Sequence, residues 1–222
     1  MARQKEPVDP ARDVQRHPLL VYHNLGRRYR PPALLLMVMG LFALLPTFIE
    51  ELENDAIEPE TLALFGLVVI LVGAGLWLFS VLAAVRSYVE VRPDVLVVRG
   101  PFRRTMISYH RIKLVQPVQV SQLYPRKDLK GIGRPLVRPL LAMTAVEVQM
   151  HSWPEPKERL MRRYGRYLFS PRADAWLFIV PAYGVLIRQI DAAVQRKAER
   201  ERGRTAYEDP IARLKYYGET GG

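Results

Sequence analysis

The sequence predicts an α+β membrane protein, in which a two-helix transmembrane hairpin precedes a small antiparallel β-barrel or sandwich with a C-terminal amphipathic helix. Two apolar runs, residues 33–49 and 62–85, contain no charged side chain. Six acidic residues and no basic residue lie between these runs. After the second run, the hydrophobic pattern changes from a helical period to the alternation of strands. These three observations predict the fold class.

The second apolar run is long enough to span a membrane with some tilt, and the first is slightly short. As helices, residues 33–49 would extend about 26 Å and residues 62–85 about 36 Å, against a hydrocarbon core of roughly 30 Å. Pro31 and Pro32 suit the start of the first span, where a missing N–H costs nothing. The acidic connection, residues 50–61, would then form a loop on the outer side of the membrane.

The distribution of charge predicts the orientation. Residues 1–32 carry a net charge of +4, residues 33–85 of −6 and residues 86–222 of +13, within a total of +11. Basic segments next to spans stay on the cytoplasmic side. We therefore expect a multi-pass protein of the bacterial inner (cytoplasmic) membrane, with a basic N-terminal segment over residues 1–32 and both termini in the cytoplasm. Neither span contains an ionisable residue, which favours an anchor over an ion pathway.

The second span has a candidate helix-packing face. Gly66 and Gly73 are seven residues apart and therefore share one side of the helix. Small residues there would let another helix approach closely. Two interpretations stay open: the two spans pack on each other, or the face binds a larger membrane complex.

A domain of short strands is expected after the second span, over residues 86–204, followed by a tail over residues 205–222. Alternating and β-branched residues between turn signals predict six strands. They are expected at residues 88–92, 95–99, 102–107, 114–120, 143–150 and 176–180. Pro117 indicates that the fourth is an edge strand or contains a bulge. After Pro181, apolar residues at helical spacing predict the amphipathic helix: Val185, Leu186, Ile190 and Val194.

The first half of this domain resembles a known family. The residues that carry the resemblance are Tyr88-Val89-Glu90-Val91, then Asp94 to Gly100, then Arg103-Arg104 and Ile107-Ser108-Tyr109-His110-Arg111-Ile112. They resemble the opening of bacterial pleckstrin-homology-like (PH-like) domains, in which Ile107, Tyr109 and Ile112 would fit the step before the fourth strand. The resemblance implies a non-catalytic scaffold that binds lipid headgroups, peptides or protein surfaces. Residues 124–139 and 151–172 depart from a compact example.

Two basic clusters are candidate contacts for anionic lipid or for a partner protein. The first lies in a Gly-containing loop and comprises Arg126, Lys127, Lys130 and Arg134. The second interleaves arginine with tyrosine and comprises Arg162, Arg163, Tyr164 and Arg166. Such clusters occur at anionic membrane surfaces and at protein interfaces. For the first cluster, an ordinary surface loop is the competing interpretation. Because the domain is expected to be tethered beside a membrane, nucleic acid is not an expected partner.

No pattern in the sequence indicates an enzyme or a cofactor. The chain has no cysteine, and its four histidines have no spacing suited to a metal. No nucleophile elbow, zincin motif or carboxylate pair is present. We therefore expect a non-enzymatic accessory or scaffold subunit of a larger membrane complex. The alternatives are a regulatory module that binds anionic lipid headgroups and an enzyme of a type without a familiar motif.

Overall fold

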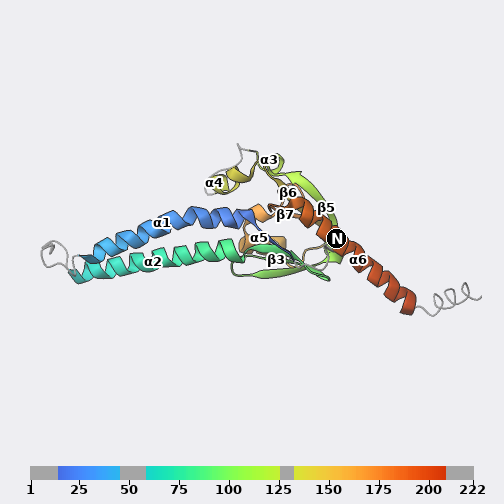
Figure 1. Ribbon diagram of the computed structural model, residues 1–222, viewed down its shortest axis with the longest axis horizontal. Coiled ribbons are helices and arrows are strands. Elements are labelled where there is room, and N and C mark those ends of the chain that lie inside the picture. The colour runs from blue at the N-terminus through green and yellow to red at the C-terminus, as the bar shows by residue number, and fades with distance from the viewer. Residues whose placement is uncertain (1–14, 46–58, 126–132, 209–222) are drawn as a thin grey trace, which may run out of the picture.

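The computed structural model describes residues 15–45, 59–125 and 133–208. Two long helices lie side by side at one end of the molecule, and a β-domain with a projecting C-terminal helix lies at the other (Figure 1). The described elements in chain order are β1 (Arg16–Pro18), α1 (Leu20–Leu44), α2 (Pro59–Arg86), β2 (Tyr88–Val91), β3 (Val95–Arg99), β4 (Arg104–Ser108), η3 (Tyr109–Arg111), β5 (Ile112–Gln119), α3 (Val120–Leu123), α4 (Gly133–Val137), η5 (Arg138–Leu140), β6 (Thr144–Met150), α5 (Lys157–Tyr164), η6 (Arg166–Leu168), β7 (Ala175–Phe178) and α6 (Tyr183–Glu208).

A line of small residues, here called the small-residue seam, joins α1 to α2 in antiparallel register. Its three pairs follow at steps of seven residues: Gly26 with Ser80, Ala33 with Gly73, and Gly40 with Gly66. A Cβ built on Gly40 would lie 2.6 Å from the carbonyl oxygen of Gly66. A Cβ on Gly73 would lie 2.9 Å from the carbonyl oxygen of Ala33. Larger side chains at these positions would therefore force the two backbones apart.

Helix α1 begins at Leu20, and Pro31 and Pro32 lie inside it. The expectation that these prolines mark the start of the helix was wrong. Each proline in a helix interior removes a backbone hydrogen bond and costs about 3 kcal/mol. Seam contacts on both sides of the prolines hold α1 against α2, because Gly26 precedes them and Ala33 follows. Tertiary packing therefore overrides the local preference.

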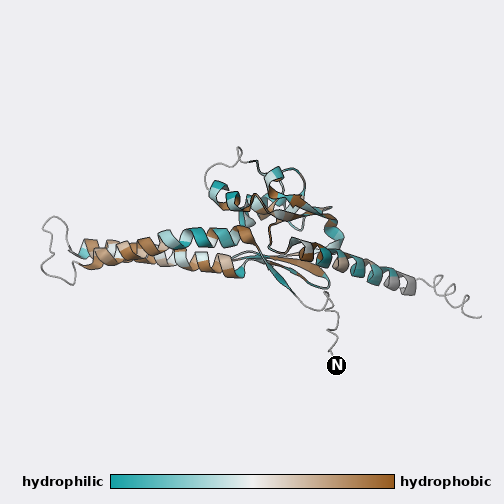
Figure 2. Cartoon of the chain, turned by 45° about the horizontal axis from the view of Figure 1, so that its top comes forward, coloured by the Kyte–Doolittle hydropathy of each residue, from teal (hydrophilic) through white to brown (hydrophobic). Residues whose placement is uncertain are grey.

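One helix among the described residues is long and apolar enough to cross a membrane, Glu60–Arg86 within α2. It contains the predicted second span, residues 62–85. Residues 33–44 of the predicted first span form the second half of α1, while residues 46–58 lie outside the described part of the chain. Figure 2 shows the apolar part of the helix pair far from the β-domain, and hydrophilic residues on α1 closer to it.

The seven described strands form two antiparallel sheets, with the orders β1-β2-β3-β4 and β5-β6-β7. All six predicted strands are present, within two residues at each end. Pro117 lies in β5, which is an edge strand with a register shift between Ile112 and Leu114. The α+β class is thus confirmed, whereas the described strands do not close into a barrel.

The main hydrophobic core is shared by the two sheets, α5 and α6. Its members include Leu96, Val98 and Ile107 from the first sheet, Val146, Val148, Trp176 and Phe178 from the second, Leu160 and Tyr164 from α5, and Leu186 and Ile190 from α6. Leu186 and Ile190 are two of the four residues on which the C-terminal amphipathic helix was predicted. Burial of this face holds the first half of α6 against the sheets.

The N-terminal end of α1 is built into the β-domain. Strand β1 pairs antiparallel with β2. The backbone N–H groups of Leu19 and Leu20 donate to the carbonyl oxygens of Ser87 and Ile179, at 3.1 and 2.9 Å. Strand β1 and the start of α1, both within the predicted N-terminal segment 1–32, therefore pack against the β-domain. The strand was missed because three residues are too few to display a period.

A second hydrophobic cluster forms around the segment inserted between β5 and β6. The segment between β5 and β6 folds, in its described part, into α3, α4 and η5. Its apolar residues cover one end of the second sheet and meet α1: they are Val120, Leu123, Leu136, Val137, Leu140 and Leu141, against Val21, Leu177 and Ile179. The insertion therefore helps to attach the helix pair to the domain.

Glu90 connects β1 to β2 through charged hydrogen bonds. Its carboxylate side chain is 1% exposed and accepts hydrogen bonds from Nε of Arg16, at 3.3 Å, and from Nε of Arg92. Burial alone would raise the pKa of Glu90, but the bonds and charges of Arg92 and Arg16 outweigh it and lower the pKa. The carboxylate is therefore held ionised in the folded state.

We expect Glu90→Gln to remove a pH-dependent part of the stability. Because the pKa is lowered on folding, the contribution of the carboxylate is fully present above the ordinary value of 4.5 and is lost as the pH falls through the lower folded value. Thermal unfolding of the full chain in detergent should show a loss of about 1–3 kcal/mol at pH 7. The difference from the natural chain should narrow towards pH 3; a constant difference would contradict this role.

Candidate functional site

The first predicted basic cluster is only partly described. Arg126, Lys127 and Lys130 lie outside the described residues, and Arg134 is exposed near the beginning of α4. Among the described residues, no hydrogen bond or ion pair joins Arg134 to the second cluster. The loop that carries Arg126 to Lys130 thus stays a sequence-based prediction.

The second predicted cluster lies on α5 and the turn that follows it. Arg162, Arg163 and Arg166 are exposed, whereas Tyr164 is 2% exposed. Tyr164, which was predicted to contact anionic lipid or a partner, therefore belongs to the core and not to an exposed surface. Leu160 and Tyr164, four residues apart, form the buried face of α5, and this leaves the arginines on the outer face.

Gly66 and Gly73, the predicted helix-packing face, lie in the small-residue seam against α1. Of the two interpretations left open, the structure places the partner of this face within the chain itself. A Cβ built on Gly75, in contrast, has no atom within 4 Å other than those of its chain neighbours and its own helix backbone. It lies on α2 away from α1.

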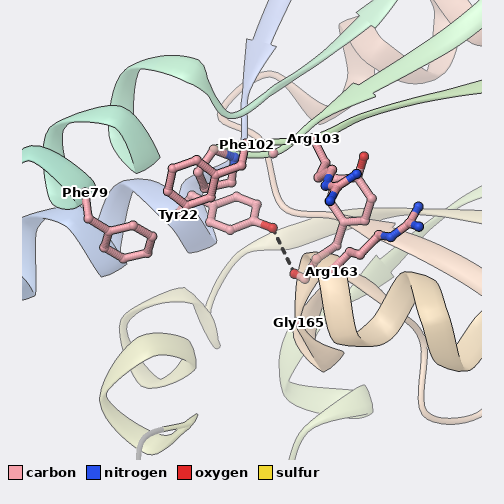
Figure 3. Close-up of a pocket in the computed structure, with 9 residues that line it drawn as sticks. Tyr22, Phe79, Phe102, Arg103, Arg163 and Gly165 are labelled. Atoms are coloured by element: carbon pink, nitrogen blue, oxygen red, sulfur yellow. Dashed lines mark hydrogen bonds between the residues drawn. The ribbon is translucent and has the colours of Figure 1, made fainter.

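A pocket of about 490 Å³, here called the junction pocket, lies where the helix pair meets the β-domain (Figure 3). Tyr22 of α1 and Phe79 of α2 line it from the helix pair. Phe102 and Arg103 line it from the turn between β3 and β4, and Arg163 from the end of α5. Four separate parts of the chain thus meet at one cavity.

The two sides of the junction pocket differ in chemistry. Phe79 and Phe102 stack with ring centroids 5.8 Å apart, and Phe102 is 70% exposed. The side chains of Arg103 and Arg163 point away from this aromatic pair, on the other side of the pocket (Figure 3). The pocket lining is therefore mainly apolar, with an aromatic wall towards α2 and a smaller cationic wall, formed by the two arginines, towards α5.

The two arginines of the cationic wall are held differently. Nη1 of Arg163 donates to both carboxylate oxygens of Glu155, at 2.9 and 2.7 Å. Arg103 is exposed, and among the described residues it takes part in no ion pair. The charge of Arg163 is thus balanced by Glu155, and Arg103 supplies the unbalanced positive charge of the pocket.

Two tyrosines and one glycine shape the pocket between these walls. The hydroxyl of Tyr22 donates to the carbonyl oxygen of Tyr164 at 2.9 Å, and that of Tyr164 is 2.8 Å from Oγ1 of Thr105. Burial raises the pKa of the Tyr164 phenol, so it stays protonated at neutral pH. A Cβ on Gly100 would lie 3.0 Å from the Tyr164 ring. Glycine at this position therefore lets the turn approach α5 closely.

Sequence reasoning found two of the five principal lining residues in different roles and missed the others. Arg163 was placed in a basic cluster, and Arg103 was noted only within the PH-like resemblance. A signal for Phe102 was present, since it stands between a turn proline and two arginines, and turn residues are expected at the surface. No local signal could show that Phe79, in the middle of an apolar run, would meet Phe102.

The described residues contain no group of three or more His, Cys, Asp or Glu able to hold a metal ion. Comparison of the chain with family models, with curated proteins and with solved structures found no match. The junction pocket itself presents arginine side chains on one side and aromatic rings on the other.

Proposed function

We propose that this chain is a membrane-anchored, non-enzymatic protein whose PH-like β-domain serves as an accessory or scaffold subunit of a larger membrane protein complex. In this proposal, α1 and α2 cross the bacterial inner membrane, with residues 50–61 outside and both termini in the cytoplasm. The PH-like assignment rests on the resemblance and is supported by the two antiparallel sheets with one C-terminal helix packed on their shared core.

The continuous path of α1 from the apolar helix pair into the core of the β-domain is the observation that carries the proposal. The helix leaves the seam at Gly26 and reaches the domain at Tyr22, without an intervening linker. A linker would let the domain change its position, whereas this connection fixes its height and orientation. A surface held in one orientation beside the membrane is what a scaffold subunit needs.

Large exposed apolar side chains on the helix pair support the membrane placement. They include Leu34, Leu35, Met39, Leu41 and Phe42 on α1, and Leu64, Phe65, Leu71 and Val72 on α2. Monomeric soluble proteins rarely expose an apolar patch this extended. A bilayer or the spans of a partner would cover it.

Purification tests the proposal directly. The full chain, tagged and extracted from its source membrane with a mild detergent, is expected to migrate as a larger complex and to bring down membrane partners in fixed ratio by mass spectrometry. Reversing the exposed charges with Arg162→Glu and Arg166→Glu should reduce this recovery, while Arg188→Glu, an exposed arginine on α6, serves as the matched control. Recovery of the natural chain as a lone monomer would overturn the proposal.

Binding of anionic lipid headgroups is the second candidate function. The cationic wall of the junction pocket beside its aromatic wall favours it, and the pocket lies on the same side of the β-domain as the membrane anchor. The two functions are compatible, because a scaffold subunit can also bind a lipid where its helix pair meets its β-domain.

A further inference from the structure

We infer that the junction pocket binds the headgroup phosphate of an anionic glycerophospholipid of the inner leaflet. This inference rests on the membrane placement in the proposed function, but not on the existence of partner subunits. It concerns a site different from the basic loop at residues 126–134, because the residues that would hold the phosphate are Arg103 and Arg163.

The position of the pocket along the helix pair matches the depth of lipid headgroups. Phe79 is next to Ser80, which faces Gly26 across the seam. The aromatic wall is therefore level with the exposed Arg27 and Arg28 of α1. Arginines and aromatic rings at the same level are typical of the membrane–water interface.

The cationic wall has donors available for a phosphate. An arginine guanidinium has five N–H donors, and the hydrogen bonds to Glu155 use only Nη1 of Arg163. Glu155 thereby holds Arg163 in place and leaves Nε and Nη2 for a ligand. Arg103 adds the unbalanced positive charge. An arginine side chain binds phosphate oxygens well, because its planar fork matches the geometry of the anion.

The aromatic wall selects a lipid over a free anion. The exposed Phe102 ring, stacked on Phe79, offers an apolar surface next to the cations. A free inorganic phosphate gains nothing from this surface. The glycerol and the first methylene groups of an acyl chain would cover it, and burial of apolar area stabilises that contact by about 25 cal/mol per Å².

Lipid titration of the full chain in mild-detergent micelles, followed by native mass spectrometry, tests the inference. Phosphatidylglycerol is expected to bind in preference to phosphatidylcholine. Arg103→Gln should weaken phosphatidylglycerol binding about fivefold, the equivalent of about 1 kcal/mol for one interfacial cation. Arg104→Gln is the matched control, because this neighbouring arginine is also exposed but does not line the pocket. Its effect should stay below about twofold.

Two outcomes would overturn the inference. Equal weakening by Arg103→Gln and Arg104→Gln would mean diffuse attraction to a basic surface without a site. Displacement of the bound lipid by millimolar inorganic phosphate, together with no effect of Phe102→Ala, would mean a site for a free anion. Equal thermal unfolding of the variants shows that folding is not the cause. A chain that purifies alone but keeps the Arg103 dependence would contradict the accessory-subunit proposal and leave this inference standing.

Discussion

Replacing Gly73 with leucine is expected to separate α1 from α2 and to lower the unfolding free energy of the full chain by about 3 kcal/mol. A Cβ alone at this position would lie 2.8 Å from Cγ of Met37 and 2.9 Å from the carbonyl oxygen of Ala33. The side chain of Met37 can move, but the backbone of Ala33 cannot without moving the helix. For a chain of this size, thermal unfolding in detergent should shift downward by about 6–12 °C.

Gly75→Leu is the matched control for Gly73→Leu. Both positions lie in α2, two residues apart, and both changes raise helix propensity by the same amount. Beyond its chain neighbours and its own helix backbone, Gly75 has no atom within 4 Å of a built Cβ, so leucine there should be neutral or slightly stabilising. Equal losses for the two variants would contradict the seam as the contact between the helices.

Truncating Trp176 to alanine is expected to cost the β-domain about 3–5 kcal/mol. Its side chain is fully buried and lies among four aromatic rings. The nearest ring centroid, that of Phe169, is 4.5 Å away. Alanine would leave a cavity that the sheets on both sides cannot close. Far-UV circular dichroism of the full chain in detergent should record a lower unfolding temperature for the sheet signal.

Trp176→Phe should recover most of this loss. The indole Nε1 of Trp176 is buried and has no hydrogen-bond partner in the described part of the chain. Phenylalanine therefore reduces the side-chain volume without breaking a hydrogen bond. It also removes the unpaired indole N–H, whose burial costs free energy. A loss equal to that of alanine would indicate that Nε1 has a partner, such as a buried water, that the protein chain does not supply.

The sequence was informative wherever a pattern repeated within one element. The six strands came from alternation and turn residues, and the buried face of α6 came from spacing at Leu186 and Ile190. Pro117 correctly indicated an edge strand. In contrast, local rules failed at Pro31 and Pro32, because the contacts that hold α1 together lie on a different helix. The small-residue seam was only partly predictable: the spacing of Gly66 and Gly73 indicated a packing face, but no pattern in the sequence paired these residues with Gly40 and Ala33 of the first run.

The junction pocket could not be predicted, because its parts come from four places in the chain. Arg103 and Arg163 are sixty residues apart in sequence, and the residues around each of them predict only an ordinary exposed cation. Phe79 reads as one more apolar residue of a span. Tyr164 was predicted to belong to an exposed Arg/Tyr surface. Its position four residues after Leu160 instead indicates a buried helix face.

The pairing of β1 with β2 also constrains how the chain can pass through a membrane. Strand β1 precedes α1, strand β2 follows α2, and Arg16 lies opposite Glu90 in the same sheet. A chain that leaves a sheet and returns to it must cross an intervening bilayer an even number of times. If α2 crosses, then α1 crosses as well, despite its prolines and arginines. The distribution of charge predicts which side of the membrane a segment takes. The pairing of β1 with β2 instead requires an even number of crossings between them, and no change of surface charge alters that requirement.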